Sequence, residues 1–203
     1  AYLCVAGGFD APLILGSRSG LEPVRAGQRL ACPESGAPAR FPGFVTSAEA
    51  LGHDPAADGF RTLDGPQADW FDAAQFYGQT FAVMPASNRM GVRLRGAPLT
   101  RPDRELVSEP VSPGAVQVTN DGQCILLGAD GQTIGGYPKV AHVIRADRDA
   151  LAQLRPGDAV RFRRVRPEEA EAASRDRARK LREWCARFEV ADDLRAVVSA
   201  AGR

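Results

Sequence analysis

The chain has 203 residues, and its 26 basic and 25 acidic side chains give a formal net charge of +1. A domain that neutralises nucleic-acid phosphates carries a clear cationic excess, so this balance argues against a nucleic-acid partner. Hydrophobic residues make up 44% and charged residues 25%, which is typical of a globular protein. The length suits one domain with a sizeable core, and 21 glycines and 15 prolines favour many short strands over a helical bundle.

The cysteines and histidines predict neither a metal site nor a disulfide scaffold. They are widely separated and include no C-x-x-C pair, so a zinc site or a redox dithiol is disfavoured. Free thiols fit a reducing compartment, and we expect a cytoplasmic protein. The sequence has no apolar run of the roughly 20 residues that a membrane span needs, so no membrane partner is expected. The residues are Cys4, Cys32, Cys124, Cys185, His53 and His142.

Short apolar runs between turn signals predict a mainly β fold over the first three quarters of the chain. The first run starts at residue 1, so we expect the chain to begin inside a domain. Asn120-Asp121-Gly122 is a hairpin signal between two runs, and the last run alternates apolar and polar residues. The predicted strands are Tyr2 to Ala6, Gln79 to Met84, Met90 to Arg95, Ala115 to Val118, Cys124 to Leu127, Val140 to Arg145 and Ala159 to Val165.

Helical patterns are fewer in this part of the chain. Short helices are predicted at Ser47 to Leu51, Asp69 to Tyr77 and Arg148 to Leu154, the last with Asp147 as its N-cap. The segment Arg25 to Gly65 is rich in Pro, Gly and Ala without a clear period, so it is expected to form loops and short elements.

From Pro167 the pattern predicts a long amphipathic helix, followed by a shorter one through Leu194, Val197 and Val198. The apolar face would be docked on the rest of the domain, and a partner-binding helix is the alternative. The opposite face would be solvated and held by i,i+4 ion pairs. The apolar face consists of Ala178, Leu181, Trp184, Cys185 and Phe188, and the predicted pairs are Glu171 with Arg175, Asp176 with Lys180 and Glu183 with Arg187.

No standard catalytic signature is present, because the P-loop, G-x-G-x-x-G, H-E-x-x-H and G-x-S-x-G patterns are all missing. Instead, polar residues lie within glycine-rich turns beside the predicted strands. In Gly135-Gly136-Tyr137-Pro138-Lys139 the glycines free the backbone, and Lys139 is delivered to the start of a strand as a point charge for a carboxylate or phosphate. The residues alone therefore indicate an anion site on a β scaffold. The alternative is a surface lysine after a bend.

The other candidates also have structural interpretations. Arg18 and Arg89 fit ion pairs, Glu109 fits an exposed loop acid or a helix-cap partner, and His142 fits a core or edge histidine. Lysine is rare in the chain: only Lys139 and Lys180 stand beside 24 arginines, as a GC-rich coding bias would give.

Taken in order, several segments resemble the allophanate-hydrolase-subunit-2-like family, also called biotin-dependent carboxyltransferase domains. The resemblance covers roughly Ala1 to Val165. The matching segments are AYLCVAGGFD with LGSRS, SNRMGVRLRG, SEPVSPGAVQVTNDGQ, DGQTIGGYPKVAHVIRAD and LAQLRPGDAVRF.

This resemblance implies a cyclophilin-like β-barrel with a few short helices. It implies a carboxyltransferase domain over residues 1–166 and a helical extension over 167–203. Family members carry a further segment before the AYLCVAGG-like strand, so the domain is expected to be N-terminally incomplete.

The resemblance also implies one component of an ATP-dependent 5-oxoprolinase-like complex, which opens 5-oxo-L-proline to L-glutamate. The implied partners are a KipI-like protein, which resembles the B component of such a complex, and a lactam-utilisation protein, which resembles the A component. ATP would be bound by the complex. One alternative is the carboxyltransferase half of a biotin-dependent urea carboxylase. Another is a non-catalytic, KipA-like regulator that binds a kinase inhibitor.

According to the family resemblance, the glycine-rich turns supply the site. Lys139, Arg89 and Arg18 would be anion clamps, and Glu109 or Asp130 would orient a base or water. We expect Lys139, Arg89 and Glu109 to act in catalysis. The substrate would be bound by Ser17, Arg18, Asp130, Gln132, Thr133 and Tyr137.

Overall fold

The computed structural model describes residue 5 and residues 7–18, 24–33 and 55–201. Most of the predicted strand Tyr2 to Ala6 and the whole predicted helix Ser47 to Leu51 lie outside these residues. The chain divides into two compact units, one formed by 1–45 with 187–203 and the other by 46–186. The second unit contains every named strand and is described first.

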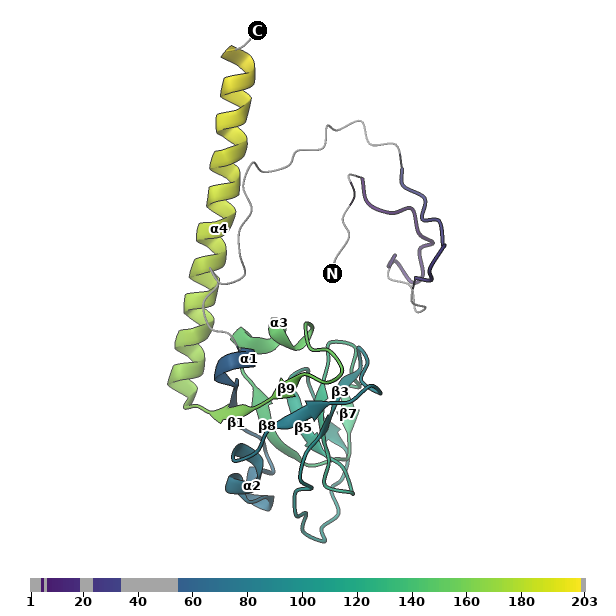
Figure 1. Cartoon of the computed structure of the whole chain (residues 1–203), viewed down its shortest axis with the longest axis vertical. Helices are drawn as coiled ribbons and strands as arrows, with labels where there is room; N and C mark the ends of the chain where they lie inside the picture. Colours follow the sequence, from purple (N-terminus) through teal and green to yellow (C-terminus); the bar gives the residue numbers. More distant parts are fainter. Residues whose placement is uncertain (1–4, 6, 19–23, 34–54, 202–203) are drawn as a thin grey trace. The chain divides into compact units, whose positions relative to one another are not determined.

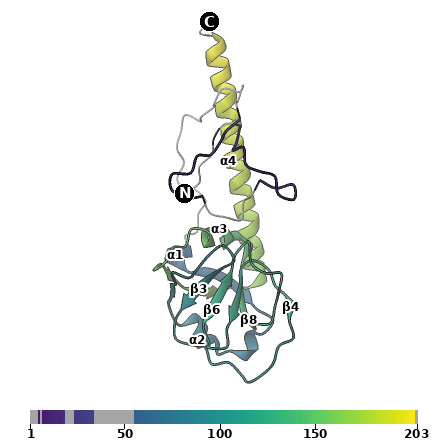
Figure 2. The same ribbon diagram turned by 90° about the vertical axis from the view of Figure 1, so that its right-hand side faces the viewer.

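Eight short strands of the second unit form one sheet, in the order β10-β1-β8-β5-β6-β3-β2-β9. Figure 2 shows the part of this wall that runs from β8 through β6 to β3. A separate two-stranded sheet, β4 with β7, lies beside it. The strands are β1 (Phe60–Asp64), β2 (Phe81–Val83), β3 (Gly91–Arg95), β4 (Glu109–Pro110), β5 (Ala115–Val118), β6 (Cys124–Leu127), β7 (Ile134–Gly135), β8 (Lys139–Val143), β9 (Ala159–Val160) and β10 (Phe162–Arg164).

The last strand segment curls the sheet into a barrel. β9 pairs antiparallel with β2, while β10, which begins only two residues after β9 ends, pairs parallel with β1. The backbone amide of Phe60 also donates to the carbonyl of Arg161, between the two short strands. One continuous stretch of chain therefore joins the two ends of the sheet, which leaves no long free edge among the described strands. The expected mainly β, barrel-like fold is confirmed.

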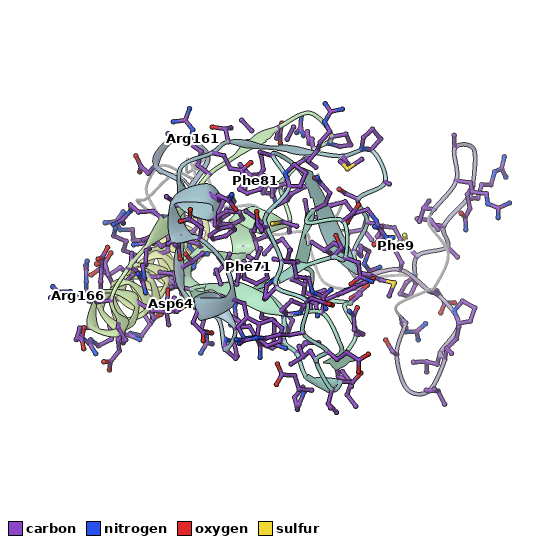
Figure 3. The ribbon with its side chains drawn as sticks, turned by 90° about the horizontal axis from the view of Figure 1, so that it is seen from below. Phe9, Asp64, Phe71, Phe81, Arg161 and Arg166 are labelled. Carbon is purple, nitrogen blue, oxygen red and sulfur yellow. The ribbon has the colours of Figure 1, made fainter. Side chains whose placement is uncertain are left out.

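The barrel is filled by large apolar side chains from opposite walls, and Phe76 lies at their centre. This ring is fully buried, stacks on Phe162 with centroids 4.9 Å apart, and lies 5.9 Å from Phe81. Phe76 comes from α2 (Ala73–Tyr77), whose N-cap Asp72 accepts a hydrogen bond from the Ala74 amide at 2.8 Å. In Figure 3, Phe71 and Phe81 lie within the ring of strands and Arg161 lies outside it.

Several predicted boundaries were wrong because local contacts redirect the chain. The predicted helix Asp69 to Tyr77 is a 3₁₀ turn, η2 (Ala68–Trp70), followed by α2, because the extended backbone of Phe71 ends the turn and Asp72 caps the helix. The predicted strand Val140 to Arg145 ends at Val143 and leads into η3 (Arg145–Asp147). The predicted helix Arg148 to Leu154 ends earlier, as α3 (Arg148–Leu151), and the short α1 spans Pro55–Asp58.

Asp147 has a different role from the N-cap that the sequence suggested. Its carboxylate makes no cap hydrogen bond and instead accepts from the Arg61 amide at 2.8 Å. The Arg61 guanidinium also pairs with it at 2.5 Å, and the Asp147 side chain is almost fully buried. Charge-assisted bonds at this depth compensate for the lost hydration of the carboxylate. Asp147 thus fixes strand β1 to the turn after β8.

The C-terminal helix is one continuous element, α4 (Pro167–Ala201), so the predicted break before Leu194 was wrong. Its first turns are docked, since Ala170 and Ala173 pack against Ile144 and Val165. Farther along, Leu181 and Cys185 are exposed, so the expected docking of the whole apolar face was also wrong. The expected pairs Glu171–Arg175 and Asp176–Lys180 are present. Figure 1 shows α4 starting directly after the last strand.

None of the described helices combines the length and apolar character needed to cross a membrane.

In the first unit, the structure shows a short turn in which the backbones of Ile14 and Ser17 hydrogen-bond to each other. The proposed domain boundary after residue 166 stays a prediction.

Replacing Phe76 by Ala should lower the free energy of unfolding by about 3–5 kcal/mol, because it empties a fully buried aromatic site. Urea denaturation followed by circular dichroism measures this loss. The control Leu181→Ala removes a partly exposed side chain from α4 and should change stability by less than about 1 kcal/mol. Equal effects in the two variants would show that Phe76 does not anchor α2 in the barrel.

Candidate functional site

A shift of register in β8 places Lys139 on the outer face of the barrel wall. β5 pairs Val116 with Ala141 but Gln117 with Lys139, so Val140 has no partner and forms a bulge. Val140 and Ala141 consequently both face the core, where they are buried. Lys139 emerges on the opposite face, beside Gln117, whereas strict alternation from Ala141 would have placed it in the core.

The two-stranded sheet then covers this face. Glu109 of β4 pairs with Gly135 of β7, and a Cβ atom at Gly135 would lie only 2.8 Å from Nε2 of Gln117. The glycine therefore permits this close approach, whereas a larger residue would require the Gln117 side chain to shift. Under this cover Lys139 is 5% exposed and Gln117 is 1% exposed. The surface-lysine alternative was wrong, because Lys139 is buried.

A polar network forms around the Lys139 ammonium. Nζ makes an ion pair with Oε1 of Glu109, and Nε2 of Gln67 donates to the same oxygen at 2.8 Å. Oε1 of Gln67 accepts from the Lys139 backbone amide at 3.0 Å, and Nε2 of Gln132 donates to Oε1 of Gln117 at 3.3 Å. We call these five residues, Gln67, Glu109, Gln117, Gln132 and Lys139, the Lys139 network.

Two buried nitrogens of this network have spare hydrogen-bonding capacity among the described residues. Nε2 of Gln117 has no hydrogen-bond partner, and Nζ of Lys139 has its ion pair but no hydrogen bond of normal geometry. Leaving a buried donor unpaired costs on the order of 1–3 kcal/mol, so such groups usually serve a purpose. Both donors suit an oxygen acceptor, such as a carbonyl or a carboxylate.

The network also keeps Glu109 ionised. The close contact with the Lys139 ammonium, and then the hydrogen bond from the Gln67 amide, hold the pKa of Glu109 below its ordinary value. About a third of the Glu109 side chain is exposed, so solvent weakens this electrostatic effect. At neutral pH the site therefore contains a carboxylate that neutralises the lysine.

The structure brings together only some of the sequence-predicted site residues. Lys139 and Glu109 form an ion pair, while Gln132 bonds to Gln117, which neighbours Lys139 through the pairing of β5 with β8. Thr133 is exposed and its carbonyl accepts from the Val111 amide, while Tyr137 is 37% exposed. Neither side chain makes a contact with the network that the structure defines.

The other expected clamps are paired elsewhere. Arg89 and Asp130 form an exposed ion pair at 2.7 Å, and the Asp130 amide donates to the Arg89 carbonyl. Arg18 pairs with Asp10 at 3.0 Å in the first unit, which also holds Ser17. All three proposed clamp cations thus face a carboxylate of this chain. The ion-pair interpretation of Arg18 and Arg89 is confirmed, and a role for these cations in binding an anion stays a prediction.

Sequence reasoning missed Gln67 and Gln117. Gln67 lies in the segment before the 3₁₀ turn, where nothing in the pattern marks a buried amide. Gln117 interrupts the buried run Ala115-Val116-Gln117-Val118, and a polar residue within a fully buried strand is the available signal. Among the residues that the structure describes, no cluster of His, Cys, Asp and Glu could hold a metal ion.

Substituting Lys139 by Met should raise the pKa of Glu109, because the variant removes the strongest contact that favours the carboxylate. Carbon-13 NMR of the glutamate carboxyl groups measures this pKa. A carboxyl group whose pKa is lowered by folding stabilises the folded state at pH values above its unfolded pKa. This stabilisation is lost as the pH falls through its folded pKa. Lys180→Met changes the only other lysine and should leave the pKa of Glu109 unaltered. An unchanged titration in Lys139→Met would contradict the ion pair.

Comparisons with known proteins place this chain in a family. Residues 1–164 match the family described as carboxyltransferase domain, subdomain A and B. The chain is 40% identical over 195 residues to the C subunit of 5-oxoprolinase from Escherichia coli, covering 88% of this chain and 60% of that protein. It is 36% identical over 176 residues to the C subunit of 5-oxoprolinase from Haemophilus influenzae, covering 83% and 57%.

A solved structure agrees with these relatives. The crystal structure of the K. lactis urea amidolyase superposes with a TM-score of 0.65 at 25% identity, covering 87% of this chain and 13% of that protein. The chain spans about 60% of the length of the curated relatives it matches. With the family match over residues 1–164 and the barrel in agreement, the chain belongs to the carboxyltransferase domain A and B family.

Proposed function

We propose that the chain acts in the C-type component of a 5-oxoprolinase-like enzyme, which opens 5-oxo-L-proline to L-glutamate at the expense of ATP. The similarity to two proteins named as the C subunit of 5-oxoprolinase supports this reaction. That name also supports a multi-subunit assembly, so we propose that activity requires two partners, a KipI-like protein of the B type and a lactam-utilisation protein of the A type. The reaction would take place in the cytoplasm.

The observation that carries the proposal is the buried Nε2 of Gln117, which has no partner in the described part of the chain and lies beside the Lys139–Glu109 pair. 5-Oxoproline has a ring-amide carbonyl and a carboxylate, and either supplies the oxygen acceptor that this donor lacks. A preorganised donor of this kind stabilises negative charge that develops on a carbonyl oxygen when the amide is attacked. Glu109 would hold the Lys139 ammonium in place and orient a water molecule or a proton acceptor.

The Lys139 network does not fit the triphosphate of ATP. Its one cation is neutralised by Glu109, and a triphosphate site needs several uncompensated cations or backbone amides. Arg89 and Arg18 are likewise paired with carboxylates. We therefore propose that ATP binds to a partner protein of the assembly and that this chain contributes the site for the small substrate.

A second candidate function is carboxyl transfer, and the likeness to urea amidolyase favours it. In that reaction the donors of the network would hold a carboxyl group that passes between biotin and an accepting amide. The two functions predict different requirements, because the first consumes ATP and releases glutamate, whereas the second requires a biotinylated carrier.

The test uses the full-length natural protein, purified together with its two partner proteins, and measures ATP-dependent release of glutamate from 5-oxoproline. We expect Gln117→Leu to lower kcat by about 10²–10³-fold, as the loss of one donor to a developing oxyanion does. Gln153→Leu is the matched control, since Gln153 is exposed near the end of α3 and should leave the rate unchanged.

Two outcomes would overturn these proposals. A correctly assembled complex that releases no glutamate would refute the hydrolase function, and carboxylation of an amide by a biotinylated carrier would then support the second candidate. An active complex in which Gln117→Leu retains full kcat would keep the reaction but remove Gln117 from the site.

A further inference from the structure

Ser112 and His142 form a hydrogen-bonded pair outside the Lys139 network. Oγ of Ser112 lies 2.9 Å from Nε2 of His142, and Nδ1 of His142 lies 3.1 Å from the Val143 carbonyl oxygen. A carbonyl can only accept, so in the neutral ring the proton sits on Nδ1 and the lone pair of Nε2 faces Ser112. The Ser112 hydroxyl then donates to Nε2, which is the arrangement of a nucleophile and its base.

The surroundings keep the imidazole neutral and the hydroxyl accessible. Burial lowers the pKa of His142, the positive charge of Arg148 lowers it further, and the Val143 carbonyl partly opposes both. Ser112, in contrast, is exposed to solvent. At neutral pH a base in its unprotonated form thus faces a hydroxyl that a reagent can reach.

Gly114 allows Arg148 to approach this pair. Gly114 has a φ of +94°, and a Cβ atom there would lie 3.2 Å from Nε of Arg148 and 3.3 Å from Cε1 of His142. Nε of Arg148 is buried without a hydrogen-bond partner among the described residues, and Arg145 is a second charge close to it. A guanidinium in this position can compensate an anion that forms beside the imidazole.

We propose that Ser112 and His142 form a second reactive site, which takes up an acyl group from an activated carboxylic ester, with Arg148 compensating the charge of the intermediate. This inference is independent of the proposed function, because it uses none of the five residues of the Lys139 network. The two sites nevertheless lie on the same face of β8. The bulge at Val140 interrupts the alternation of side chains, so Lys139 faces outward as His142 does.

The bonds and charges of the step balance without any further reactant. The Ser112 oxygen bonds to the acyl carbon as its proton moves to Nε2, and the carbonyl electron pair moves to oxygen. When the carbonyl re-forms, the bond to the leaving group breaks and its electron pair departs with the alkoxide. The imidazolium then releases its proton, to the leaving group or to solvent, and an acyl-serine remains for water to hydrolyse.

The test incubates the chain with p-nitrophenyl acetate and follows both the release of p-nitrophenolate and the acetylated peptide by mass spectrometry. We expect acetylation of Ser112, its loss in Ser112→Ala, and a rate at least about 10²-fold lower in His142→Gln. Ser174→Ala is the control, because the Ser174 hydroxyl bonds to the Ala170 carbonyl and has no base beside it. Thermal unfolding of each variant checks that the fold is retained.

A second measurement does not depend on a folded His142 variant. In Ser112→Cys the neutral imidazole can take the thiol proton as the sulfur attacks, so iodoacetamide should alkylate Cys at this position faster than the exposed Cys32 and Cys185. Acetyl groups found on residues other than Ser112, or an alkylation rate no higher than that of the exposed cysteines, would overturn the proposal.

Discussion

One unpaired residue, Val140, decides which side chains of strand β8 reach the candidate site. Without this bulge, alternation would send Lys139 into the aromatic core, where no carboxylate could reach it. With it, Lys139 and His142 both face outward while Val140, Ala141 and Val143 fill the barrel. The position of Lys139 in the polar network and the packing of Val140 in the core both depend on that single shift of register, which also places Lys139 on the face of β8 that His142 occupies.

The Lys139–Glu109 pair is better explained by function than by stability. Removing a lysine from water has a large desolvation cost, which a single partly exposed carboxylate only partly offsets. A hydrophobic residue under the β4–β7 sheet would remove this cost, and it would also satisfy the need for packing. The neighbouring Gln117 amide, buried without a partner among the described residues, points the same way. These spare donors support the proposed role of the site in holding an oxygen-bearing ligand.

The predictions from the sequence were accurate where local signals agree with the tertiary contacts. β5 and β6 were predicted at their observed residues, because two apolar runs flank a turn in which Gly122 adopts the positive φ it needs. β1 was missed because its inward positions include Thr62, whose hydroxyl is satisfied by Tyr77 and by the Arg163 carbonyl of the neighbouring strand β10. β4 and β7 have two residues each, too few to show any alternation.

By itself the sequence determined the β class, the hairpin and the family resemblance. It also singled out Lys139, at the end of a glycine-rich turn, as a candidate site residue. Only the tertiary structure decided that Lys139 is buried, that Glu109 is its partner and that Gln67 and Gln117 complete the network. It also showed that Arg18 and Arg89 are paired with carboxylates of this chain. The reason is that local composition sets secondary structure, whereas the bulge and the covering sheet bring together residues up to 72 positions apart, as in the bond from Lys139 to Gln67.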